Sequence, residues 1–175
     1  GDGVEARVHP TFIPANHPLA SVSDAFNAVY VVGDTVGDIM LYGRGAGEMP
    51  TASAVVSDVI YAATHSEIKY STFKNTASGD TGVKFISDFI SAYYIRLFVD
   101  DNVGMLAKMS SIFAKYGVSI VEIAQKPKDA YGKDNERVPL IIITHKTKEN
   151  SIRNAVAKIN VSGAATVEAV IRLEA

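Results

Sequence analysis

The feature that most constrains the fold is a repeated switch of hydrophobic period in the second half of the chain. Stretches in which every second residue is apolar alternate with stretches in which apolar residues recur every three or four positions. A period of two indicates a half-buried strand, and a period near 3.6 indicates an amphipathic helix. In chain order, 93–99 alternates, 105–116 has helical spacing, 118–124 is extended, 138–144 is a β-branched apolar run, 152–159 has helical spacing and 167–173 alternates. This order, βαββαβ, is typical of a ferredoxin-like fold, in which both helices cover one face of an antiparallel four-stranded sheet.

The helix expected at 105–116 is the clearest element. Its apolar stripe includes Met105, Met109 and Phe113, which we interpret as core side chains and not as a cofactor pocket. Gly117 then offers a left-handed stop, a conformation that glycine adopts readily. Residues 126–137 are polar, so the strands on either side are expected to form a hairpin with a long loop.

The first half of the chain shows a different sequence pattern. Short extended stretches interrupted by turn residues run through residues 4–42 and predict strands of one sheet. After a glycine-rich stretch, residues 50–64 place Val55, Val59 and their neighbours on one helical face. Residues 65–82 lose this periodicity and collect Ser, Thr, Asn, Asp and Gly, so we place a boundary between two halves there.

Composition favours a globular chain and excludes several function classes. The chain has 175 residues, of which 47% are hydrophobic, enough for a sizeable core. Its 17 Lys and Arg against 19 Asp and Glu give a formal net charge of −2, which offers no electrostatic basis for binding nucleic acid. No apolar run approaches the roughly 20 residues that cross a bilayer, and no secretory leader opens the chain. We therefore expect a cytoplasmic protein without nucleic-acid or membrane partners.

Few side chains carry an obvious chemical signal. The chain has no cysteine, which excludes disulfides, thiolate metal sites and cysteine nucleophiles. The histidines, His9, His17, His65 and His145, show no metal-site spacing, and none lies beside a serine set up as a nucleophile. We expect structural or solvated roles for them and no metal site. No two carboxylates are forced together by spacing, so no catalytic residue is assigned.

Three glycines, Gly43, Gly45 and Gly47, lie between an expected strand and the helix that begins near Pro50. Glycines let the backbone approach a ligand closely, and free N–H groups at a helix start favour an anion. The spacing GxGxG differs, however, from the dinucleotide fingerprint GxGxxG. From the residues alone, an anion-binding loop and a tight crossover between strand and helix remain equally open.

A second turn, formed by residues 101–106, joins the first strand and the first helix of the second half. Gly104 permits a tight turn, and Asn102 offers a donor and an acceptor beside the N–H groups of the helix start. A small zwitterion could dock there. Ordinary helix capping by Asp101 or Asn102 is the alternative, and the residues alone favour it.

Several motifs in one order resemble the later part of homoserine dehydrogenase. In the first half these are Val8-His9-Pro10-Thr11-Phe12-Ile13-Pro14, His17-Pro18-Leu19-Ala20, Asn27-Ala28-Val29, Tyr42-Gly43-Arg44-Gly45-Ala46-Gly47 and Pro50-Thr51-Ala52-Ser53-Ala54-Val55. In the second half, Tyr93-Tyr94-Ile95-Arg96-Leu97 and Asp101-Asn102-Val103-Gly104-Met105-Leu106-Ala107 resemble the C-terminal ACT domain that many of those enzymes carry. Val103 stands where the family's D-x-P-G-V-L-A turn usually has Pro, so a fixed φ is lost and a looser turn is expected.

The resemblance implies an α+β chain, in which a partial α/β catalytic-domain segment precedes a ferredoxin-like βαββαβ ACT domain. Residues 1–41 would end the catalytic and dimerisation domain, and 42–64 would form the glycine-rich loop and the helix that returns to the nucleotide-binding domain. Residues 65–90 would be a linker, and 91–175 the ACT regulatory domain. The family's Rossmann domain and catalytic lysine would lie upstream, so we expect an excised piece that is inactive alone and has no catalytic residue.

The resemblance also implies a reaction. Homoserine dehydrogenase, an oxidoreductase, reduces aspartate 4-semialdehyde to homoserine with NAD(P)H, on the route to threonine, methionine and isoleucine. The family's nucleotide-contacting glycine corresponds to Gly47, with Gly43 and Gly45 shaping the loop. No cofactor is expected to bind to this chain alone.

By the same resemblance, the ACT domain is an allosteric module that senses an amino acid, with threonine as the expected feedback inhibitor. The matching effector positions are Asp101, Asn102, Gly104 and Met105. Effector sites of the family usually lie between paired ACT domains, so a homo-oligomer, a dimer or a tetramer, is expected.

Two other hypotheses remain open. The first is a stand-alone amino-acid-binding or dimerisation module, in which residues 91–175 bind the ligand and the first half is scaffold. The second is a structural pairing domain without ligand, in which the turn at Asn102 only caps a helix. In either case, apolar surface in the first half is expected to drive dimerisation or poor order near residues 1–18.

Overall fold

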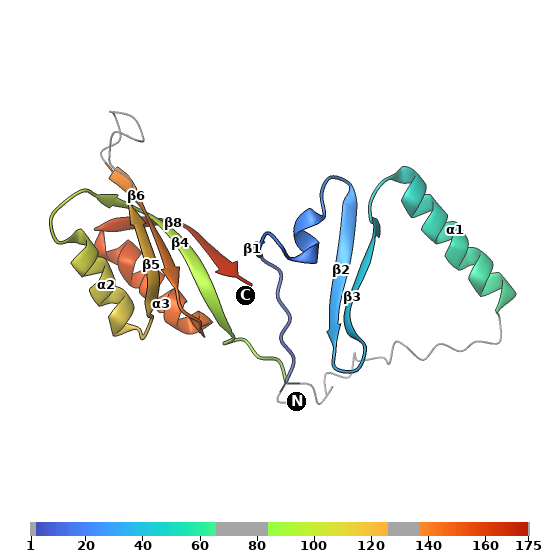
Figure 1. Ribbon diagram of the computed structural model, residues 1–175, viewed down its shortest axis with the longest axis horizontal. Helices are drawn as coiled ribbons and strands as arrows, with labels where there is room; N and C mark the ends of the chain where they lie inside the picture. The colour runs from blue at the N-terminus through green and yellow to red at the C-terminus, as the bar shows by residue number, and fades with distance from the viewer. Residues whose placement is uncertain (1–2, 66–83, 126–136, 175) are drawn as a thin grey trace. The chain divides into compact units, whose positions relative to one another are not determined.

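The computed structural model describes residues 3–65, 84–125 and 137–174, which fall into two compact units (Figure 1). The first unit combines the described residues up to Phe12 with those from Lys84 onward. The second contains those from Ile13 to His65. Most of the expected linker, and the polar loop expected from 126, lie outside the described residues.

An antiparallel sheet forms the centre of the first unit. Its strands, in spatial order, are β8 (Ala165–Leu173), β4 (Ile90–Asp100), β6 (Arg137–Thr144) and β5 (Ile120–Gln125). Two helices complete the unit, α2 (Met105–Lys115) after β4 and α3 (Glu149–Ser162) before β8. A short strand, β7 (Thr147–Lys148), pairs with the start of β4. Strand order and chain order together confirm the ferredoxin-like βαββαβ fold.

The core of this unit lies between one face of the sheet and the two helices. Alternate residues of β4, namely Tyr93, Ile95, Leu97 and Val99, are at most 1% exposed. They share one buried cluster with Met109 and Phe113 of α2 and with Ile152, Ala155 and Ile159 of α3. Because the same side chains of β4 meet both helices, both helices cover one face of the sheet (Figure 1). The interpretation of the methionine and phenylalanine stripe as core is confirmed.

A further strand, β1 (Thr11–Phe12), extends the sheet on the outer side of β8. It runs parallel to β8, with Thr11 opposite Arg172, and the amide of Glu174 donates to the carbonyl of Phe12 at 2.9 Å. The expectation that residues 4–42 form strands of one sheet is therefore wrong. A strand of two residues is too short to show a hydrophobic period in the sequence. It forms because the edge of β8 has unpaired backbone groups with which it can pair.

Phe89 holds the beginning of the chain against this unit. Its side chain is 7% exposed and is flanked by two guanidinium groups, with Arg7 at 4.2 Å and Arg172 at 5.2 Å from the ring centroid. His9 stacks near the same ring at 6.5 Å. Cation–π contacts of this kind, together with β1, explain why the first residues group with the second half of the chain.

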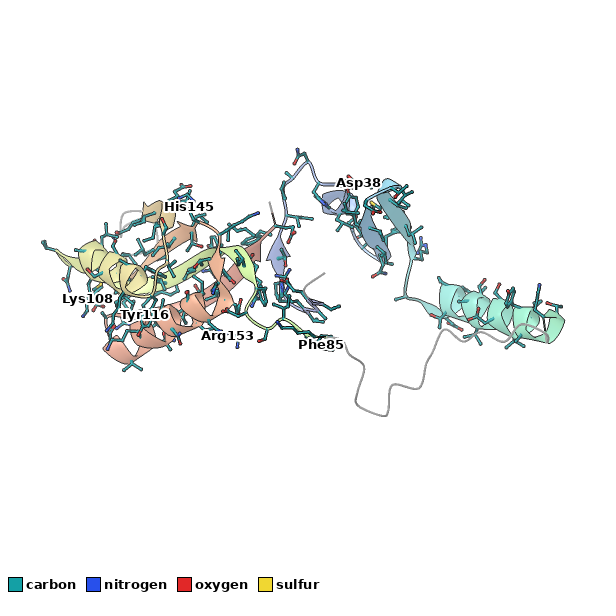
Figure 2. The ribbon with its side chains drawn as sticks, turned by 90° about the horizontal axis from the view of Figure 1, so that it is seen from below. Asp38, Phe85, Lys108, Tyr116, His145 and Arg153 are labelled. Carbon is teal, nitrogen blue, oxygen red and sulfur yellow. The ribbon has the colours of Figure 1, made fainter. Side chains whose placement is uncertain are left out.

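Glu149, the first residue of α3, is the centre of a buried polar network. It is 4% exposed, and its carboxylate accepts hydrogen bonds from Tyr93 Oη at 2.7 Å and Arg172 Nη2 at 2.6 Å. Arg153, one turn along α3 and labelled in Figure 2, donates through Nε at 3.0 Å. Since a buried carboxylate is tolerated only when its oxygens are paired, this network fixes α3 to β4 and β8.

The second unit is a hairpin and a helix. The strands β2 (Phe26–Gly33) and β3 (Gly37–Arg44) pair antiparallel, with Asn27 opposite Gly43, and α1 (Glu48–Thr64) follows after three residues. A short 3₁₀ helix, η1 (Pro18–Ser21), precedes the hairpin. The helix expected at 50–64 is confirmed, and part of the extended sequence expected in residues 4–42 forms the hairpin.

Apolar side chains of the second unit are exposed. In the described part of the chain, α1 has no buried residue, and its apolar face, Val55, Val56, Val59 and Ile60, is between 56 and 62% exposed. The hairpin likewise exposes Val29 and Leu41. A helix that buries nothing gains little from tertiary packing, so this unit depends on a surface outside the described residues or on association.

Substitution of Glu149 tests the polar network. Glu149→Gln is expected to lower the free energy of unfolding by about 3 kcal/mol, because the partly buried Arg172 guanidinium loses its counter-charge at a buried partner. Glu168→Gln is the matched control, since Glu168 pairs with Arg96 where both side chains are about 40% exposed, and it should cost less than about 1 kcal/mol. Urea unfolding followed by circular dichroism measures both. Equal losses would contradict the network.

The same variant has a defined pH dependence. Burial would raise the pKa of Glu149, but the hydrogen bonds from Tyr93, Arg153 and Arg172 outweigh burial and lower its pKa from the ordinary 4.5. Its contribution is therefore present above the ordinary pKa and is lost as the pH falls through the lowered one. The difference in unfolding free energy between wild type and Glu149→Gln should shrink below about pH 4.5. A constant difference down to about pH 2 would contradict this cause.

Candidate functional site

The glycine-rich loop links β3 to α1. Gly47 is the N-cap of α1, with φ of +122° and ψ of 155°, a conformation accessible essentially to glycine. The amide of Thr51 donates to the carbonyl of Gly47 at 3.1 Å, and within the described residues no side chain caps the helix. The first N–H groups of α1 therefore stay available to an anion.

A hollow opens beside this loop. It is lined by Gly45, Ala46 and Gly47 of the loop and by residues of the first turns of α1, among them Glu48, Thr51 and Ala52. The structure thus brings Gly45 and Gly47 to one site and gives Gly47 a conformational reason to be glycine. Gly43 lies within β3 and lines a separate hollow on the hairpin together with Gly45.

Next to the loop, three side chains stack on the hairpin. The rings of Phe26 and Tyr42 are parallel, with centroids 4.9 Å apart, and the guanidinium of Arg44 lies 5.0 Å from the centroid of Phe26. This stack fixes the last residue of β3, and through it the first residue of the loop. Sequence analysis did not single out Arg44, because cross-strand stacking depends on the register.

The second candidate site is the turn between β4 and α2. Gly104 is the N-cap of α2 in the left-handed conformation, with φ of +90°, and the amide of Met105 donates to the carbonyl of Asn102 at 3.2 Å. The side chain of Asp101 accepts from Nε2 of Gln125, on β5, at 3.1 Å. Neither Asp101 nor Asn102 caps α2, so the capping interpretation favoured by the residues alone is wrong. The N-cap position is taken by Gly104 instead of Asp101 or Asn102, and glycine is the residue that adopts its positive φ readily.

The turn forms a hollow of about 510 Å³. It is lined by residues 99–107 and by Gln125, and so contains every predicted effector position: Asp101, Asn102, Gly104 and Met105. Within the described residues no side chain caps α2, so the N–H groups of its first turn have no side-chain partner. Met105 is only partly buried and packs against the core, and Val103 is fully exposed.

Gln125 is the residue of this site that sequence analysis missed. It ends β5 and reaches the turn only because β5 and β4 lie in one sheet, with β6 between them. No local motif signals such a contact. Its amide still has a carbonyl oxygen that can accept a hydrogen bond from an ammonium group.

Three of the four histidines make local side-chain contacts, and His145 is exposed. His17 Nδ1 accepts from the amide of Leu19 at 3.1 Å and so caps η1, while His9 contacts the hydroxyl of Thr11 at 2.9 Å. His65 stacks on Tyr61, with centroids 4.3 Å apart. Among the residues that the structure describes, no three metal-ligating side chains gather into a metal site.

Two family models match the chain. Homoserine dehydrogenase matches residues 1–60, and the ACT domain matches residues 93–162. The chain is 36% identical to homoserine dehydrogenase of Bacillus subtilis over 171 residues, which cover 91% of the chain and 36% of that protein. This chain belongs to the homoserine dehydrogenase family.

Other members of the family give the same result. The homoserine dehydrogenase of Corynebacterium glutamicum is 37% identical over 98% of the chain and 37% of that protein. The crystal structure of a homoserine dehydrogenase from Thiobacillus denitrificans superposes with a TM-score of 0.78 at 36% identity, over 99% of the chain and 40% of that structure. The chain thus spans little more than a third of the length of its homoserine dehydrogenase relatives.

We call the first unit of the fold, which contains the residues that match the ACT domain, the ACT unit.

None of the helices in the described ranges is long and apolar enough to cross a membrane.

A substitution at Gly104 tests the geometry of the turn. Gly104→Ala is expected to lower the free energy of unfolding by about 1 kcal/mol, because a β-carbon disfavours this φ. Crowding does not contribute, since apart from its chain neighbours no described residue has a heavy atom within 4 Å of the position of that β-carbon. Gly104→Asn is the matched control and should cost less, because Asn tolerates the left-handed region. Thermal unfolding measures both, and equal costs would contradict the assigned turn.

Proposed function

We propose that this chain is the C-terminal portion of a cytoplasmic homoserine dehydrogenase that reduces aspartate 4-semialdehyde to homoserine with NAD(P)H. The observation that carries the proposal is the glycine-rich loop at an uncapped helix start, in a chain of this family. Such a helix start favours an anion, and phosphate groups of a dinucleotide are anions that a glycine backbone can approach.

The role proposed for the loop is to contact the nucleotide. Gly47 would lie against it, while Gly43 and Gly45 shape the approach. The dinucleotide supplies the hydride. This chain contributes backbone N–H groups, at the start of α1, that hold and orient the anionic part of the cofactor. The hydride-accepting site and the catalytic lysine are proposed to lie in the preceding domains of the enzyme.

The ACT unit is proposed to bind threonine as a feedback effector at the turn between β4 and α2. A free amino acid is a zwitterion, and the turn offers partners for both charges. The N–H groups at the start of α2 suit the carboxylate, and the side chains of Asp101 and Gln125 offer oxygens for the ammonium group. The exposed apolar faces of α1 and of the hairpin are proposed to be covered in a homodimer or tetramer.

Activity in a hybrid enzyme tests the first proposal. The chain alone should not oxidise NADPH with aspartate 4-semialdehyde, whereas a hybrid in which it replaces the matching segment of the Bacillus subtilis enzyme should. In that hybrid, Gly47→Val should raise the dissociation constant for NADPH at least about tenfold, because a branched side chain disfavours φ of +122° and fills the approach. Turnover by the chain alone, or unchanged affinity in Gly47→Val, would contradict the proposal.

Calorimetric titration of the chain with threonine tests the second. Saturable binding is expected for threonine. Homoserine and methionine are titrated separately as controls. Asn102→Ala should weaken binding about tenfold, since Asn102 provides a donor and an acceptor in the hollow. Asn154→Ala, an exposed asparagine on α3, is the matched control and should leave affinity unchanged.

The controls also separate the competing hypotheses. Threonine binding by a chain whose hybrid lacks dehydrogenase activity would favour a stand-alone amino-acid-binding module. Absence of binding in both the chain and an active hybrid would favour a domain that only assembles the enzyme.

A further inference from the structure

Gly45 and Gly47 are glycines for different reasons. Gly47 has a positive φ, whereas Gly45 is not among the glycines with positive φ, so its backbone conformation is open to other residues. A β-carbon added to Gly45 would instead lie 2.4 Å from Nδ2, 2.8 Å from Cγ and 3.1 Å from Cβ of Asn27. The side chain of Asn27 therefore occupies the space that a side chain at position 45 needs.

A rotation of the Asn27 side chain cannot fully relieve this contact. Its Cβ is fixed by the backbone of β2, and that backbone is fixed by pairing of Asn27 with Gly43. Gly45 lies two residues beyond Gly43 and so takes the diagonal position relative to Asn27, where neighbouring strands bring side chains of one face together. Asn27 and Gly45 therefore form a matched pair, in which the side chain of Asn27 fills the space left by the missing side chain of Gly45.

The pair lies where the hairpin meets the loop. Asn27 and Gly45 line the same hollow of about 260 Å³ on the hairpin, and Gly45 also lines the hollow at the start of α1. Gly45 is thus the residue through which the hairpin can set the path of the loop toward Gly47.

We propose that Asn27 is a positioning residue for nucleotide binding, which sets the path of the glycine-rich loop by packing against Gly45. The inference rests on the proposed function of the loop. It predicts that Gly45 is required because of its neighbour on β2, and that the two positions are energetically coupled. Asn27 acts through the loop backbone and not through the reacting atoms.

A double-mutant cycle in the hybrid dehydrogenase tests the inference. Gly45→Ala should raise the dissociation constant for NADPH about tenfold, with kcat at saturating NADPH changed less than about twofold. Asn27→Ala removes the two nearest atoms, so the double variant Asn27→Ala, Gly45→Ala should bind NADPH several times more tightly than Gly45→Ala alone. Thr35→Ala, at an exposed polar residue in the turn of the same hairpin, is the control and should leave affinity unchanged.

The same variants in the 175-residue chain give a readout that needs no cofactor. Gly45→Ala should lower the melting temperature of the second unit, and Asn27→Ala should partly restore it. Amide hydrogen exchange of Gly47 and Glu48 should accelerate in Asn27→Ala, because the loop loses its support.

Each outcome decides one point. Additive effects of Asn27→Ala and Gly45→Ala on both readouts would overturn the matched pair. Coupled melting temperatures with unchanged affinity for NADPH in every variant would overturn the positioning role, provided that Gly47→Val still weakens binding. If Gly47→Val also leaves affinity unchanged, the proposed function of the loop fails, and the role of Asn27 in nucleotide binding fails with it.

Discussion

The paired carboxylate of Glu149 is the interaction on which the ACT unit depends. It accepts hydrogen bonds from β4 through Tyr93, from β8 through Arg172 and from its own helix through Arg153. Burial and the hydrogen bond to Glu149 raise the pKa of Tyr93, so its hydroxyl stays protonated and keeps donating. Because Arg172 and Arg7 both lie against Phe89, the network extends to the beginning of the chain.

β4 connects this network to the proposed effector turn. Phe89 and the Glu149 network lie at the first residues of β4, and the turn with Gly104 follows its last residue. Between them, alternate side chains of the strand are buried beneath both helices. One rigid strand therefore fixes both ends of the ACT unit, and the turn inherits its geometry from a packed core instead of from a flexible loop.

Hydrophobic period predicted the fold well where elements are long. The alternation of residues 93–99 predicted the central part of β4, whose burial alternates over all eleven residues, and the helical spacing of the apolar stripe predicted α2. Local patterns could not predict the two residues of β1, whose partner lies about 160 positions away in β8. At the two sites the glycines could be identified from the sequence. Gln125 and Asn27 could not, because each contacts its site from another strand of a sheet. Asp101 or Asn102 was predicted as the N-cap of α2 because residue preferences at N-caps favour Asp and Asn. These preferences take no account of the backbone conformation, and the N-cap is Gly104, with its positive φ.

The central claim is that an amino-acid effector binds at the turn between β4 and α2. Nuclear magnetic resonance of the ¹⁵N-labelled chain during titration with threonine tests it most directly. The account predicts saturable amide shifts concentrated in residues 101–106 and at Gln125, with the hairpin of β2 and β3 unchanged. Saturable shifts concentrated on the hairpin or around Glu149, or no shifts at millimolar threonine, would contradict it.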